Sequence, residues 1–126
     1  MNREEINQLA TKVLGLAIEV HKELGPGLLE SSYERALCYE LSQSNITFER
    51  QVRLPISYKG VKLEFEYAID IWIEKSIILE LKSVEKIQPI HEAQLMTYLK
   101  LSKNTIGYLI NFNTPLLRDG IRRRAL

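Results

Sequence analysis

The chain has 126 residues, 45% of them hydrophobic, with 17 basic and 16 acidic side chains. This length and apolar content fit one compact domain over residues 1–126, and the balanced charge means that any nucleic-acid contact has to come from local patches. The single cysteine excludes an internal disulfide, the first residues lack the apolar core of a signal peptide, and no apolar run is as long as a membrane span. We therefore expect a cytoplasmic protein without membrane contact.

Three amphipathic helices are predicted along the chain. Apolar residues recur at helical spacing over residues 2–24, and the run Gly25-Pro26-Gly27 ends this helix because proline lacks an N–H group and glycine permits unusual dihedral angles. A second helix is expected over residues 28–44. Pro89 opens a third helix, which continues to about residue 102.

Strands are predicted between the second and third helices and again after the third. Breaks at Lys59-Gly60 and near Glu74-Lys75 indicate hairpin turns, and the tail from residue 113 is polar and basic. The order α-α-β-β-β-α-β predicts an α/β fold in which a four-stranded mixed sheet is flanked by helices, with a charged site at one edge. The four strand segments are 47–59, 61–74, 76–83 and 105–112.

The hairpin that turns at Lys75 is expected to bring three charges together. Residues equally distant from this turn face each other, so Asp70 lies opposite Glu80, and Lys82 follows on the same side by strand alternation. Opposed Cβ atoms lie about 4.5–5.5 Å apart, so the two carboxylates repel unless a cation lies between them. The other side of the hairpin then forms one apolar surface from Ile69, Ile71, Ile73, Ile77, Leu79 and Leu81.

An Asp and a Glu beside a Lys support two interpretations. Two carboxylates supply the hard oxygen ligands of Mg²⁺ or Mn²⁺, which suits phosphate chemistry, and Lys82 can orient a water molecule or stabilise the developing charge. Alternatively, Lys82 forms a buried ion pair with Asp70 or Glu80 that only holds the sheet together.

Two polar stripes on the helices are also candidates for a site. His91, Gln94 and Tyr98 share one face of the third helix. Glu30 and Tyr33 lie one turn apart at the start of the second helix. The alternatives are a polar surface face for the first stripe and, for Glu30, simple stabilisation by the helix dipole.

In combination these segments resemble a known family. Gly27, Glu30 and Tyr33 spell G-x-x-E-x-x-Y. The runs ELGPGLLESSYERAL, ELKSVEKIQPIHEAQLMTYLKLS and GYLINFN resemble the GxxExxY proteins, a branch of the PD-(D/E)XK nuclease superfamily, from about residue 20 to residue 123. The resemblance implies a restriction-endonuclease-like core and a nuclease that uses Mg²⁺ or Mn²⁺.

The resemblance also assigns roles to individual residues. It implies that Asp70 binds metal, that Glu80 and Lys82 form the (D/E)-x-K pair, and that Ile69 stands where many members have proline. Gln94 and Tyr98 match the Q-x-x-x-Y motif of several nuclease branches. The implied catalytic residues are Asp70, Glu80, Lys82, Gln94 and Tyr98, and the implied metal ligands are Asp70, Glu80, the Leu81 carbonyl and Glu30.

The resulting hypothesis is metal-dependent hydrolysis of phosphodiester bonds in nucleic acid, DNA being the first expectation. The competing hypothesis is a binding or adaptor module that keeps a nuclease scaffold without activity, and a homodimer is left open. Basic side chains that could contact phosphates, although the last three could equally form a solvated tail, are Arg50, Arg53, Lys62, Lys86 and Arg122–Arg124.

Overall fold

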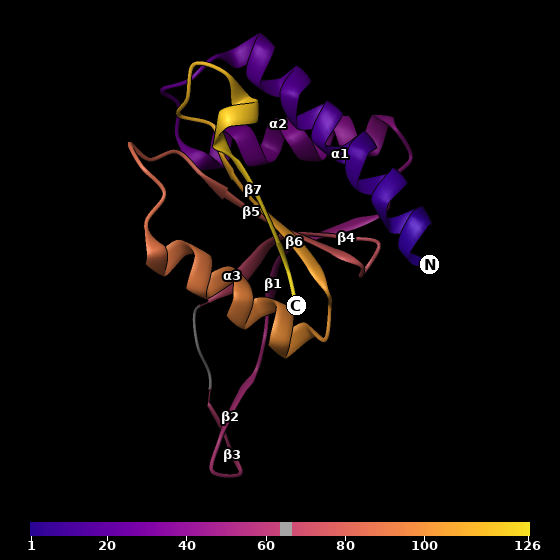
Figure 1. Cartoon of the computed structure of the whole chain (residues 1–126), viewed down its shortest axis with the longest axis vertical. Coiled ribbons are helices and arrows are strands. Elements are labelled where there is room, and N and C mark those ends of the chain that lie inside the picture. Colours follow the sequence, from indigo (N-terminus) through magenta and orange to yellow (C-terminus); the bar gives the residue numbers. More distant parts are fainter. Residues whose placement is uncertain (64–66) are drawn as a thin grey trace.

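The computed structural model describes residues 1–63 and 67–126, as an α/β fold with helices on both faces of a sheet (Figure 1). Within these residues, no helix is both long and apolar enough to cross a membrane. The elements are α1 (Arg3–Leu24), α2 (Glu30–Gln43), β1 (Phe48–Arg53), β2 (Ile56–Tyr58), β3 (Val61–Leu63), β4 (Ala68–Ile73), β5 (Ile77–Lys82), α3 (Pro89–Ser102), β6 (Ile106–Asn111), the short 3-10 helix η1 (Leu117–Gly120) and β7 (Ile121–Ala125).

The main sheet has five strands in the order β1-β4-β5-β6-β7, so the prediction of four strands was one too few. The additional strand, β7, comes from the tail that was expected to be only polar and basic, and it pairs antiparallel with β6. Strands β5 and β6 are parallel and are joined through α3, while the other neighbours are antiparallel. The predicted site is also not at the sheet edge, because β5, which carries Glu80, is the central strand.

The first two predicted strands are each divided in the structure. Pro55, which cannot donate to a strand ladder, separates β1 from β2. The predicted turn at Lys59-Gly60 is confirmed, since both residues have positive φ and join β2 to β3. This small two-stranded sheet projects away from the main sheet (Figure 1). Residues 64–66 of the second predicted strand lie outside the described residues.

The helices begin and end at recognisable caps. Asn2 and Glu5 form a capping box at the start of α1, and Gly25, with φ +69°, ends that helix. Pro89 occupies the first turn of α3, as predicted, and Lys103 ends the helix in a left-handed conformation. Helices α1 and α2 cover one face of the sheet and α3 covers the other (Figure 1).

The register of the β4–β5 hairpin follows the prediction. Ile71 pairs with Leu79 and Ile73 pairs with Ile77 on the face that packs against α1 and α2. Ile69 is an exception, because it packs with the apolar cluster beneath α3 instead of continuing the predicted surface. The β4–β5 ladder ends at the Ile71–Leu79 pair, and beyond it the Asp70 backbone N–H donates to the Glu80 side chain.

Candidate active site

Asp70 and Glu80, called the carboxylate pair below, lie beside each other on β4 and β5, as the hairpin register predicts. The Asp70 backbone N–H donates to Glu80 Oε1 at 3.0 Å, and the Leu81 N–H donates to Asp70 Oδ2 at 2.8 Å. The Glu80 residue is only 3% exposed, and Asp70 is half-buried. Two acidic groups are thus held between neighbouring strands with little access to water.

Burial makes negative charge unfavourable at this position. It is the main cause that raises the pKa of Asp70 to about 6, and the negative charge of Glu34 is a smaller cause in the same direction. Burial also raises the pKa of Glu80 well above its usual value, with the charge of Asp70 as the second cause. The pair therefore holds a proton more readily than two exposed carboxylates would, and a bound cation would favour full ionisation.

Lys82 lies near both members of the carboxylate pair. Its positive charge lowers the pKa of Asp70 and of Glu80, although by less than burial raises them. Within the described residues, Lys82 forms no ion pair with either carboxylate within 4.0 Å. The predicted grouping of Asp70, Glu80 and Lys82 is present, but the simple buried ion pair is not.

A second buried carboxylate, Glu34 on α2, was not among the predicted site residues. It accepts two hydrogen bonds from Arg50, at 2.6 and 3.1 Å, and one from Gln51 at 2.6 Å. The Gln51 amide also reaches Asp70 Oδ1 at 3.4 Å, which links this arrangement to the carboxylate pair. We call Glu34, Arg50 and Gln51 the α2 cluster.

The sequence does contain a signal for Glu34. It lies three residues before Leu37 and seven before Leu41, so it occupies the buried stripe of its helix. An acidic residue in an apolar stripe needs a partner, because burying an unpaired charge is unfavourable. Its partners come from β1, where Gln51 has a left-handed backbone with φ +52°, and no local sequence pattern indicates that conformation.

Tyr33, the last residue of the G-x-x-E-x-x-Y motif, contacts only other parts of the fold in the interactions described below. Its position on a polar stripe made it a candidate for the site, but its side chain is fully buried. Its hydroxyl donates to the Gly25 carbonyl at 2.6 Å and accepts from the Leu28 N–H at 3.1 Å, and its ring stacks on Phe112 at 4.4 Å. Gly27 has φ +97° in the same turn, so both motif residues shape the connection between α1 and α2.

Glu30 is exposed in the first turn of α2. Its negative charge contributes to the raised pKa of Glu80, so the two residues are within electrostatic range. Over residues 1–63 and 67–126, however, no three His, Cys, Asp or Glu side chains gather into a metal-binding group. Glu30 therefore does not join the carboxylate pair as a third side-chain donor in this arrangement.

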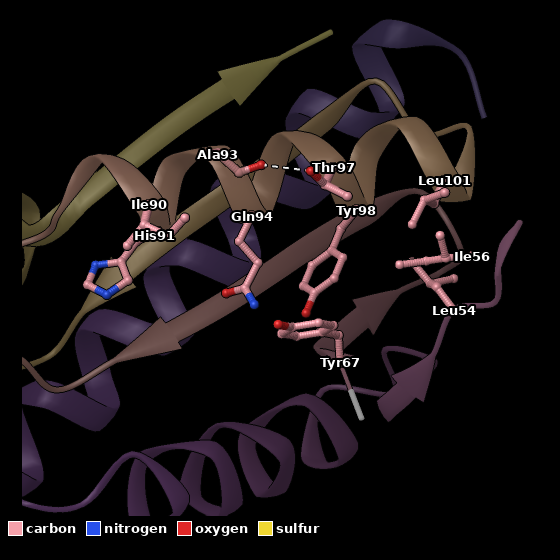
Figure 2. Close-up of a pocket in the computed structure, with 10 residues that line it drawn as sticks. All are labelled: Leu54, Ile56, Tyr67, Ile90, His91, Ala93, Gln94, Thr97, Tyr98 and Leu101. Atoms are coloured by element: carbon pink, nitrogen blue, oxygen red, sulfur yellow. Dashed lines mark hydrogen bonds between the residues drawn. The ribbon is translucent and has the colours of Figure 1, made fainter. Parts of the chain in front are cut away.

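The polar face of α3 borders a cavity. His91, Gln94 and Tyr98 all line this cavity, as their spacing on one helix face predicts (Figure 2). Tyr98 is 4% exposed, and burial raises the pKa of its hydroxyl, followed by the charges of Glu80 and Asp70. Tyr98 thus connects the cavity with the carboxylates.

The predicted phosphate-contacting residues are dispersed. Arg50 binds Glu34, and Arg124 forms an ion pair with Glu92 on α3. The other five basic residues are exposed and lie on different elements of the fold. They are Arg53 on β1, Lys62 on β3, Lys86 between β5 and α3, and Arg122 and Arg123 on β7.

Comparison with known proteins identifies the family of this fold. The family model described as the PD-(D/E)XK nuclease superfamily matches residues 7–124. The chain belongs to the PD-(D/E)XK nuclease superfamily. No curated protein and no solved structure matches the chain. The five-stranded mixed sheet with flanking helices is consistent with the restriction-endonuclease-like fold that was predicted.

The donor set of this PD-(D/E)XK chain fits a divalent cation. Mg²⁺ is commonly held by one or two carboxylates together with water and substrate phosphates, so a third acidic side chain is not required. Asp70 and Glu80 supply two carboxylates whose mutual repulsion and burial a cation would relieve. The residues that would hold such an ion are therefore Asp70 and Glu80, with the Leu81 carbonyl as the third donor that the family resemblance implies.

Proposed function

We propose that this protein is a nuclease of the GxxExxY branch that hydrolyses phosphodiester bonds in nucleic acid with the help of Mg²⁺ or Mn²⁺. The observation that carries the proposal is the carboxylate pair: two adjacent, poorly solvated acidic groups with Lys82 nearby. A purely structural role does not require two acidic groups to face each other, because their repulsion destabilises the sheet.

Each nearby residue has a chemical task in this proposal. When bound, the metal neutralises phosphoryl charge and lowers the pKa of a coordinated water. Lys82 orients the attacking water and stabilises the charge that develops on the phosphoryl group. Gln94 and Tyr98 position a phosphate or Lys82 from the α3 side, and Glu30 adds negative charge that favours a cation at the pair.

A second function, a binding or adaptor module without activity, has one observation in its favour. The chain has 17 basic and 16 acidic residues, and Arg50 and Arg124 are already engaged by Glu34 and Glu92. The field available to attract a polyanion is therefore small. The carboxylate pair with Lys82 argues against this alternative, because a binding scaffold has no need of three poorly solvated charges together.

A cleavage assay separates these two functions. Purified wild type is incubated with single-stranded and duplex DNA and RNA in EDTA, Mg²⁺ or Mn²⁺, beside Glu80→Gln prepared in the same way. The nuclease proposal expects cleavage that needs metal and is lost in Glu80→Gln, which keeps the shape of the side chain but not its charge. Cleavage that persists in Glu80→Gln would reveal a contaminating enzyme, and no cleavage by wild type under any condition would favour the binding module.

Metal binding is tested independently of cleavage by thermal unfolding. Millimolar Mn²⁺ should raise the melting temperature of wild type, because an ion that binds only the folded state stabilises it by mass action. Asp70→Asn should remove most of this increase while it folds normally without metal. Equal increases in wild type and Asp70→Asn would place the ion somewhere other than the carboxylate pair.

A further inference from the structure

A cavity of about 310 Å³ lies between α3 and the chain around β2. Leu54, Ile56 and Leu101 form its apolar end, and the Gln94 and Tyr98 side chains project from α3 toward Tyr67 (Figure 2). The ten described residues that line it include no Asp, Glu, Lys or Arg; they are Leu54, Ile56, Tyr67, Ile90, His91, Ala93, Gln94, Thr97, Tyr98 and Leu101.

Tyr98 connects this cavity with the strands that carry the carboxylate pair. Tyr98 belongs to the apolar cluster that contains Ile69, the residue before Asp70, and Ile78, which precedes Glu80 by two positions. After burial, the charges of Glu80 and Asp70 are the largest causes that raise the pKa of the Tyr98 hydroxyl. A strand with a phosphodiester bond at the carboxylate pair would therefore have its neighbouring nucleotide at the mouth of the cavity.

The lining suits a flat aromatic group with a polar edge. The exposed Tyr67 ring offers a stacking surface, the leucine and isoleucine side chains offer apolar contact, and Gln94 offers both a donor and an acceptor. The absence of Lys and Arg from the ten lining residues disfavours a phosphate inside. A volume of 310 Å³ lies at the lower end of the range for ligand sites, which leaves room for a single base and not for a base pair.

We propose that this cavity binds one unpaired nucleobase beside the phosphodiester held at Asp70 and Glu80. The preferred substrate class is therefore nucleic acid with an unpaired base next to the cleaved bond: a single strand, a frayed end or a flap. This inference rests on the proposed nuclease function, which supplies the position of the phosphodiester.

The test fills the cavity without substituting any of the proposed catalytic residues. Ala93→Trp and Thr97→Trp each add a large side chain from an exposed position of α3 that lines the cavity. The matched control is Ser42→Trp, at an exposed position near the end of α2 that does not line it. Affinity for a labelled single strand and for a blunt duplex of the same sequence is measured by fluorescence anisotropy in Ca²⁺, and cleavage of both is measured in Mn²⁺.

We expect wild type and Ser42→Trp to bind the single strand more tightly than the duplex. Ala93→Trp should weaken single-strand binding by about tenfold, the effect of one lost stacked base, and should leave duplex binding unchanged. Thr97→Trp should do the same, which guards against a folding defect in one variant. Circular dichroism and the melting temperature verify that all three variants fold.

The outcomes distinguish the two proposals. If wild type cleaves nucleic acid but shows no preference for unpaired bases, or if folded cavity-filling variants behave like Ser42→Trp, the base-binding proposal is overturned and the nuclease remains. If wild type cuts nothing but binds single strands in a way that both variants abolish, the cavity is supported and the nuclease proposal falls. If the variants instead change only self-association, the cavity accommodates a second copy of the chain and the base-binding proposal is overturned.

Discussion

Two acidic sites, Glu34 in the α2 cluster and the carboxylate pair, lie within one hydrogen-bonded arrangement, but the protein compensates their negative charges to different extents. Glu34 in the α2 cluster is 6% exposed and accepts three hydrogen bonds from Arg50 and Gln51. Glu80 in the carboxylate pair is 3% exposed and accepts a hydrogen bond from the backbone of Asp70, another acidic residue. Burial is similar, but only one of the two glutamates is matched with a cation.

This difference in hydrogen-bond and ion-pair partners indicates which buried charge has a structural role. A carboxylate with a guanidinium and an amide around it has its charge compensated by the protein itself. The carboxylate pair is compensated only in part, by backbone hydrogen bonds and by Lys82, and the pKa of each member is raised. The negative charge of such a site is not fully compensated until a cation binds, which is the property expected of a metal or substrate site.

The largest expected effect concerns Lys82. If Lys82 orients water and stabilises developing charge, Lys82→Ala should reduce the cleavage rate by about a hundredfold to a thousandfold. Its affinity for nucleic acid in Ca²⁺ should change much less, because one cation among several contributes only part of binding. Single-turnover cleavage and anisotropy on the same preparation measure both quantities.

A different result for Lys82→Ala would break the comparison. If Lys82 only neutralises the carboxylates, its loss should lower the unfolding free energy by about 3–5 kcal/mol, the effect of leaving a buried charge unpaired. A strongly destabilised Lys82→Ala protein, together with a wild type that cuts nothing, would make the carboxylate pair a structural element like the α2 cluster.

The next effect is the pH dependence of stability without metal. The pKa of Asp70 is about 6 in the folded state and 3.8 in the reference state, so between these values the folded chain binds more protons than the unfolded chain. The contribution of Asp70 is therefore fully present below pH 3.8 and is lost as the pH rises through 6, a decrease of about 3 kcal/mol. Glu80, whose pKa is also raised, acts in the same direction.

Urea unfolding in EDTA at several pH values measures this decrease. Asp70→Asn lacks the ionisation, so its unfolding free energy should fall less than that of wild type between pH 4 and pH 7. The difference between the two proteins isolates Asp70 from the other carboxylates. Parallel curves for wild type and Asp70→Asn would mean that Asp70 is already compensated in the folded state.

Glu34→Gln tests the compensated side of the comparison. Removing the charge weakens two hydrogen bonds from Arg50 and should lower the unfolding free energy by about 2 kcal/mol, as expected for bonds to a charged group. Cleavage should change little. Glu23→Gln, at an exposed position of α1, is the control for the loss of one negative charge. A folded, stable Glu34→Gln protein that no longer cleaves would move Glu34 from the scaffold into the active site.

Much of the fold around the carboxylate pair could be predicted because it depends on apolar alternation. The run from Ile71 to Leu79 has only one register that buries its isoleucine and leucine residues together, and that register places Asp70 near Glu80. The bounds of α3 could also be predicted, because Pro89 marks its first turn and its residues have helical periodicity. Local pattern and tertiary burial agree in these segments.

Other features depend on contacts that a local pattern does not encode. Strand β7 is rich in arginine and lies at the sheet edge, so pairing with β6 decides its conformation more than its own apolar content. Ile69 packs beneath α3 beside the point where the Asp70 N–H binds the Glu80 side chain, and the left-handed Gln51 contacts partners from α2 and β4. Within the site, the sequence therefore predicted which charges meet but not how the surrounding scaffold compensates them.

The smallest expected effect concerns Tyr33 of the motif, whose hydroxyl, like the Glu34 carboxylate, is satisfied by partners within the protein. Tyr33→Phe keeps the ring that stacks on Phe112 but removes the hydroxyl that binds Gly25 and Leu28, so the unfolding free energy should fall by about 1 kcal/mol. The cleavage rate should stay within about twofold, since the hydroxyl is used to hold the turn before α2 and no free donor is left for a substrate. Tyr39→Phe, on an exposed position of the same helix, is the matched control and should change neither quantity. A Tyr33→Phe protein with unchanged stability and much slower cleavage would return Tyr33 to the active site, where the motif alone had placed it.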